Sequence, residues 1–139
     1  MIKKFFVSAL PMLVVFLFDN VVNNSLGLYD RWRWLDIPMH LLGGVVAAWS
    51  CHRFYKKIKN EINIKPLFAR LWLYVGTTAI IGILWEVYEF LVHVVTRIIT
   101  QPSVGDTVHD LVNDLIGAVL FCGLIFLFDK NKKKMIKRE

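Results

Sequence analysis

The sequence predicts an all-α fold: a polytopic integral membrane protein with four transmembrane helices in a bundle. Hydrophobic residues make up 56% of its 139 residues. The mean hydropathy of +0.51 is higher than ordinary soluble domains show. Four segments approach the ~20 residues that cross a bilayer. We expect them at about residues 4–24, 37–55, 68–95 and 107–128, in one domain that ends in a basic cytoplasmic tail, residues 129–139.

The basic residues indicate the orientation. Fourteen of the 17 Lys and Arg residues lie at the N-terminus, between residues 53 and 70, or in the C-terminal tail. This is the positive-inside bias, and it predicts both termini on the cytoplasmic side of a bacterial inner membrane. Topology alone accounts for the net charge of +6, so we expect membrane lipids as partners and no nucleic acid.

The first segment begins like a secretory signal, because Lys3 and Lys4 precede an apolar run. No small-residue cleavage site follows Phe18, so we expect an uncleaved helix. Asp19 and Asn23 share one face near its outer end. They either cap the bundle or extend a polar site.

The connection to the second helix alternates aromatic and charged residues, including Tyr29, Trp32 and Trp34. This pattern suits a segment at the lipid headgroups, and substrate recognition by either tryptophan is the alternative. The next helix carries Asp36 and His40 four residues apart, above a stripe of small residues, Gly43, Gly44 and Ala47. Such stripes let membrane helices approach closely.

At the cytoplasmic end of the second helix, we expect His52 to lie at the surface. Cys51 and Cys122 both fall toward this side of the membrane. Because the cytoplasm is reducing, we expect them to be packing residues rather than a disulfide.

The third helix carries Glu86, Glu89 and His93 on one narrow face. Glu86 lies about 13 Å from the outer end at 1.5 Å per residue, near the middle of a ~30 Å hydrocarbon core. An isolated carboxylate there would be costly, so we expect Glu86 to be protonated, paired or bound to a cation. We then expect a turn at Pro102 and Gly105.

The fourth helix opens with the densest polar pattern of the chain. Residues 105–118 place Asp106, His109, Asp110, Asn113 and Asp114 at helical spacing before an apolar run. The four-span topology puts these groups, those of the second helix and those of the third in the same outer half of the bundle. We therefore predict one shared polar cavity that opens to the exterior.

Carboxylates and imidazoles on facing helices are how bundles hold metals, and this mixture suits Zn²⁺, Mn²⁺, Fe²⁺ or Mg²⁺. The candidate metal ligands are His40, Glu86, Glu89, Asp106 and Asp110. The candidate catalytic residues are Glu86, Glu89 and Asp110. Further lining residues are Asp36, His93, His109, Asn113 and Asp114. Without a metal, close carboxylates would share protons and suit acid–base chemistry or a proton relay. A network that only specifies helix packing is the third interpretation.

These motifs resemble the YjdF-type family of small bacterial inner-membrane proteins. The resemblance covers about residues 36–120: Asp36 with His40, Glu86 with Glu89, and a last helix with Gly105, Asp106, Asp110, Asp114, Gly117 and Ala118. Asp110, Leu111, Asn113 and Gly117 are also similar to the VanZ-like family, which is associated with teicoplanin resistance. The first resemblance implies the fold and the site but no reaction.

The sequence therefore leaves three functions open. The first is an envelope enzyme or resistance factor that uses a metal or an acid–base site on a lipid or lipid-linked substrate. The second is a transporter subunit that handles protons or cations. The third is a structural membrane protein. The chain shows no nucleophile motif, phosphate loop or dinucleotide motif, which argues against those chemistries.

Overall fold

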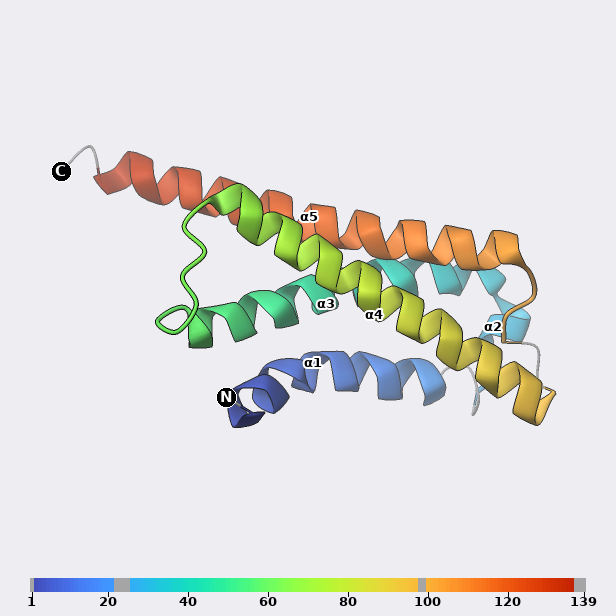
Figure 1. Cartoon of the computed structure of the whole chain (residues 1–139). Coiled ribbons are helices and arrows are strands. Elements are labelled where there is room, and N and C mark those ends of the chain that lie inside the picture. The colour runs from blue at the N-terminus through green and yellow to red at the C-terminus, as the bar shows by residue number, and fades with distance from the viewer. Residues whose placement is uncertain (1, 22–25, 98–99, 137–139) are drawn as a thin grey trace.

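The computed structural model describes residues 2–21, 26–97 and 100–136, with side chains for all of these except residue 30 and residues 129–136. The fold is all-helical (Figure 1). Four long helices, α1 (Ile2–Asn20), α3 (Asp36–Ile58), α4 (Leu67–Thr96) and α5 (Val104–Ile136), are joined by short connections. The first connection contains the single turn α2 (Leu28–Arg31) and the 3₁₀ turn η2 (Arg33–Leu35). The prediction of an all-α chain with four long helices is confirmed.

The helix ends depart from the predicted ranges in places. α1 ends at Asn20, short of the predicted residue 24, and Asn23 lies outside the described residues. α5 begins at Val104, so Gly105 belongs to the helix rather than to a turn. The Ser103 hydroxyl accepts a hydrogen bond from the Asp106 amide at 3.2 Å, which satisfies a free amide of the first turn. α5 also continues through the start of the basic tail to Ile136.

The central helix of the bundle is α3, which contacts α1, α4 and α5. α2 and the α4–α5 connection lie at one end of the bundle, which we call the α2 end (Figure 1). Both termini and the α3–α4 connection lie at the other, which we call the termini end. α3 packs most extensively on α5, whereas α1 packs chiefly on α3.

Two glycines make the α3–α5 crossing close. A Cβ atom on Gly44 would lie 2.0 Å from the carbonyl oxygen of Asp114, and one on Gly117 would lie 2.2 Å from the carbonyl oxygen of Leu41. Any larger residue would therefore meet the backbone of the other helix. The predicted small-residue stripe does lie at a helix–helix contact, as is usual in membranes.

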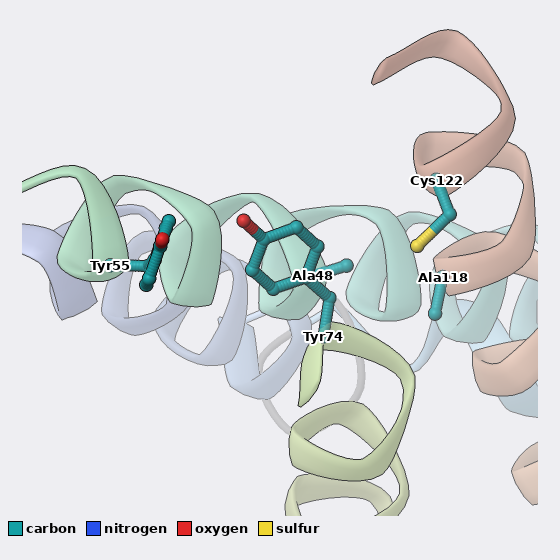
Figure 2. Packing of buried hydrophobic residues seen from close by; sticks show 5 residues of the cluster. All are labelled: Ala48, Tyr55, Tyr74, Ala118 and Cys122. Carbon is teal, nitrogen blue, oxygen red and sulfur yellow. The ribbon is translucent and has the colours of Figure 1, made fainter. Parts of the chain in front are cut away.

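A small apolar core lies toward the termini end of the bundle. It consists of Ala48, Tyr55, Tyr74, Ala118 and Cys122, from α3, α4 and α5 (Figure 2). Cys122 and Cys51 are both free thiols.

His52 packs against this core, so the expectation of a surface histidine was wrong. Its Nδ1 lies 3.0 Å from the Tyr74 hydroxyl, and its ring contacts the ring of Phe121. Its position near the end of an apolar span suggested full exposure to solvent, whereas side chains of α4 and α5 cover part of its ring.

In this bundle polar side chains lie inside, and many large apolar side chains lie on the outside. The buried residues include nine polar or charged ones: Ser8, Asp19, His40, Ser50, Thr78, Glu86, Glu89, Asp110 and Asp114. Large apolar side chains of α1, α4 and α5 point outward. Among the described residues, Leu67–Thr96 and Val104–Phe128 are long and apolar enough to cross a bilayer. An apolar exterior around a polar interior fits a protein solvated by lipid.

Candidate functional site

The candidate site is built around His40, in the second turn of α3 at the α2 end. Its Nε2 lies 3.5 Å from Oδ1 of Asp36 and 3.8 Å from Oδ1 of Asp110. Its Nδ1 lies 3.5 Å from Oδ1 of Asp114. Asp36 is one helical turn before His40, and Asp110 and Asp114 are one turn apart on α5. The close α3–α5 crossing therefore places carboxylates at both nitrogens of one buried imidazole.

The carboxylate of Asp114 lies in a slot between α3 and α4, and on the α4 side a glycine is needed to leave room for it. A Cβ on Gly82 of α4 would come within 2.6 Å of Oδ2, and one on Gly43 of α3 within 3.5 Å of Oδ1. The Trp85 ring lies perpendicular to the imidazole, with ring centres 6.5 Å apart. These neighbours restrict the rotamers of Asp114 and His40, so the polar group is positioned by packing.

Three of these residues could share one metal ion. Among the described side chains, the donor atoms of Asp36, His40 and Asp110 all lie within 4.8 Å of one another. Metal–ligand bonds of 2.0–2.2 Å in a tetrahedral site place ligand atoms about 3.3–3.6 Å apart. The His40–Asp36 and His40–Asp110 separations of 3.5 and 3.8 Å are close to that spacing. Asp114 faces the other ring nitrogen, where carboxylates commonly orient a metal-ligating histidine.

Glu86 and Glu89 are buried on α4 but lie outside this three-residue group, as far as the described side chains show. Oε2 of Glu86 accepts a hydrogen bond from the Gln101 amide at 3.1 Å. That amide nitrogen also donates to the Thr107 hydroxyl at 2.6 Å. Oε1 of Glu86 is buried and has no hydrogen-bond partner among the described residues. The Glu89 carbonyl oxygen accepts a hydrogen bond from Thr100 at 2.7 Å.

Gln101 is a site residue that sequence reasoning missed. It lies in the α4–α5 connection, where no helical period marks which side chains turn inward. The only available signal was its position beside Pro102, in a turn that must return the chain to the bundle.

The remaining candidates lie around the site rather than within the three-residue group. Asp106, Asn113 and His93 are partly buried, and His109 is exposed. Nδ1 of His93 is buried, and the described part of the chain offers it no hydrogen-bond partner. None of these four residues lines the small cavity beside His40, so their role as lining residues stays a prediction.

A cavity of about 30 Å³ adjoins His40 and Asp114 and reaches between α1, α3 and α4. This is room for about two water molecules. Asp19 of α1 lines it as well.

The Tyr29 hydroxyl donates a hydrogen bond to Asp19. Burial and this carboxylate raise the pKa of Tyr29 above its ordinary value of 10.0. Asp19 thus does both things that the sequence left open: it lines the cavity and it ties the α2 turn to α1.

The profile of the family described as "Predicted membrane protein (DUF2238)" matches residues 4–131. The chain belongs to this family. The match spans all four long helices of this DUF2238 protein, and the family description agrees with its two long apolar helices and its apolar exterior. No curated protein and no solved structure matches the chain.

Proposed function

We propose that this membrane protein binds one divalent metal ion through Asp36, His40 and Asp110 and uses it on a lipid or lipid-linked substrate. The observation that carries the proposal is the convergence of these three donor atoms within 4.8 Å, with Asp114 at the opposite nitrogen of the imidazole. We further propose four spans in a bacterial inner membrane, with both termini cytoplasmic and the site in the outer half.

Charge balance supports a metal ion here. Asp36, Asp110 and Asp114 surround one imidazole, which can carry at most one positive charge. Two of these carboxylates are buried, and unpaired charges are costly away from water. A divalent cation would offset two negative charges while leaving the imidazole neutral as a ligand. The mixture of one nitrogen and two carboxylate oxygens suits Zn²⁺, Mn²⁺ or Fe²⁺, with Mg²⁺ as the harder alternative.

The neighbouring groups support a hydrolytic use of the ion. A metal with open coordination positions lowers the pKa of bound water and polarises a carbonyl or phosphoryl oxygen. The adjoining cavity has room for water. Glu86 supplies a buried carboxylate whose Oε1 has no partner in the part of the chain that the structure describes. We assign it the general acid–base role, with Glu89 beside it. The depth of the site restricts substrates to those that membranes deliver, such as a lipid or lipid-linked headgroup.

Proton or cation handling is the second candidate, because an imidazole between three carboxylates can also relay protons. The lack of buried carboxylates beyond the site weakens this interpretation. Among the described residues, the interior toward the termini end holds the core of Tyr55, Tyr74 and their neighbours together with buried hydroxyl groups, and no buried Asp or Glu continues the chain of titratable groups there. The resemblance to the VanZ-like family would make the enzyme an envelope resistance factor.

Metal content and metal-dependent stability test the proposal. Protein purified in detergent without chelator should carry about one metal ion per chain. Adding that ion to stripped protein should raise the thermal midpoint by mass action. His40→Gln and Asp110→Asn should abolish both effects. His109→Gln is the matched control, because His109 is exposed on the same helix as Asp110.

The outcomes separate the candidates. A wild type that neither retains nor responds to any divalent metal refutes the metal centre. A pH-driven proton flux in vesicles, lost in His40→Gln, would then favour proton handling. Reporter fusions after Lys3 and after Lys134 should both report the cytoplasm, and a C-terminal fusion exposed outside would refute the orientation.

A further inference from the structure

A second, larger cavity lies outside the polar site, toward the termini end. It has a volume of about 440 Å³ and is lined by α1, α3 and α4 together with residues of the α3–α4 connection. Its walls are mostly apolar, with Met12, Phe54, Ile58, Leu73 and Ile81 among them. α1 meets α4 toward the α2 end, where the ring of Phe16 contacts those of Trp85 and Tyr88. Toward the termini end the space between α1 and α4 opens as a groove. We call it the α1–α4 groove.

We propose that the α1–α4 groove binds one acyl chain of an anionic phospholipid. Water is a poor occupant because apolar cavities remain dry. An empty groove is also unfavourable, because its lining would forfeit dispersion contacts. In a membrane, the apolar molecule present at high concentration is the lipid chain. This site does not depend on a bound metal.

The length of the groove matches one leaflet. Along α3 its lining runs from Ala47 to Ile58, and along α4 from Leu73 to Ile81. At 1.5 Å per residue these stretches measure about 16 and 12 Å, which is about half of a ~30 Å hydrocarbon core. One chain of one leaflet therefore fits, whereas a whole lipid pair across the bilayer does not.

The charge at the termini end selects an anionic headgroup. Ile58, Ile62 and Ile64 line that end of the groove. The same stretch of sequence, residues 56–65, carries four lysines: Lys56, Lys57, Lys59 and Lys65. Basic residues beside a membrane surface attract anionic lipid. Glu61 is the acidic residue of the stretch, and it is already paired with Lys4 at 2.7 Å.

The groove also continues toward the polar site. Met12, Ala47 and Ile81 line both the groove and the cavity beside His40. The end of a bound chain would thus form the floor of the site cavity. The lipid would close that cavity on the side of the termini end and leave it accessible from the α2 end.

Native mass spectrometry tests this site on the whole protein, released from vesicles of mixed phosphatidylcholine and phosphatidylglycerol with chelator present. The wild type should retain one phospholipid, with phosphatidylglycerol enriched over its share in the vesicle. Leu73→Trp and Ala9→Leu each add volume inside the groove and should lose most of that lipid. Leu84→Trp is the control, because Leu84 points outward from α4 and is 61% exposed.

Equal lipid retention by all four proteins would overturn the proposal, as would equal retention of the two lipids. A wild-type dimer that the groove-filling variants convert to monomers would overturn it too, by assigning the groove to a second copy of the chain. Because chelator is present throughout, failure of the metal centre does not change any of these outcomes.

Discussion

The α3–α5 crossing offers a sharp test of the structure, because two glycines lie within it and two others do not. Gly44→Ala places a Cβ 2.0 Å from a backbone oxygen of α5, and Gly117→Ala places one 2.2 Å from a backbone oxygen of α3. Ordinary contact begins at 3.4 Å, so the helices must move apart by more than an ångström. At Gly76 and Gly123, no atom of the described residues beyond the adjoining backbone of the same helix lies within 4 Å of the position that a Cβ would take. These two glycines serve as matched controls.

The expected signs are opposite for the two pairs. Alanine is favoured over glycine in a helix interior by about 0.8–1 kcal/mol, so Gly76→Ala and Gly123→Ala should be neutral or raise the free energy of unfolding. Forcing a methyl group into a filled interface costs about 1–3 kcal/mol. Because the obstacle is backbone rather than a flexible side chain, the cost should exceed the propensity gain. Gly44→Ala and Gly117→Ala should therefore lower the free energy of unfolding.

Far-UV circular dichroism during denaturation in mixed micelles measures these differences, with all variants compared in the same micelle. Stability is read as a shift of the midpoint at constant slope. If Gly44→Ala and Gly117→Ala are as stable as Gly76→Ala and Gly123→Ala, the close crossing is wrong. The arrangement of Asp110 and Asp114 around His40 depends on this crossing, so it would be refuted too.

Three further predictions concern single side chains. Glu86→Gln should preserve folding and the metal-dependent shift of the thermal midpoint, because Glu86 lies outside the three-residue group. The same variant should abolish turnover. Loss of the midpoint shift would instead make Glu86 a metal ligand. Tyr29→Phe removes the donor to the buried Asp19 and should cost about 1–3 kcal/mol in the same denaturation assay, and an unchanged midpoint would contradict the contact. The hydrogen bond and charge of Lys4 hold the pKa of Glu61 in the folded protein below its ordinary value of 4.5. The pair therefore stabilises the fold at pH values above 4.5. This stabilisation is lost as the pH falls through the lowered pKa of the folded state. Lys4→Gln should lower the thermal midpoint slightly at pH 7 and should have no effect at a pH low enough to protonate Glu61 in both the folded and the unfolded state; equal differences at both pH values would argue against the pair.

The helices could be predicted because their signals are local. Apolar segment length and the helical period located all four long helices, and the Gly43–Gly44–Ala47 stripe predicted a close contact. The predicted ends were least accurate for α5. There a serine cap and a helix-compatible basic tail extend the helix beyond its apolar run. Hydropathy marks where a helix enters lipid, and it does not mark where the helix ends.

The site could be predicted as a region but not as a set of atoms. Helical period assigns a residue to a face within a broad sector, and His40 and Asp110 were correctly expected to be neighbours. Which carboxylates reach the imidazole depends on where α3 and α5 cross and on the rotamers they allow. Asp36 and Asp114 were expected only to line the cavity, yet they lie as close to His40 as Asp110 does. Gln101 had no periodic signal at all.

Asp114 links the architecture of this protein to its proposed chemistry. Its carbonyl oxygen lies 2.0 Å from the position that a Cβ on Gly44 would take. Its carboxylate lies beside Gly82 and faces Nδ1 of His40. One residue therefore marks the helix crossing and orients the imidazole. A variant that moves α5 away from α3 should weaken metal binding without touching a ligand. Gly44→Ala should lower the metal-dependent midpoint shift as well as the stability, whereas Gly123→Ala should leave the shift unchanged. A stable Gly44→Ala protein with an undiminished metal response would separate the crossing from the site and refute this coupling.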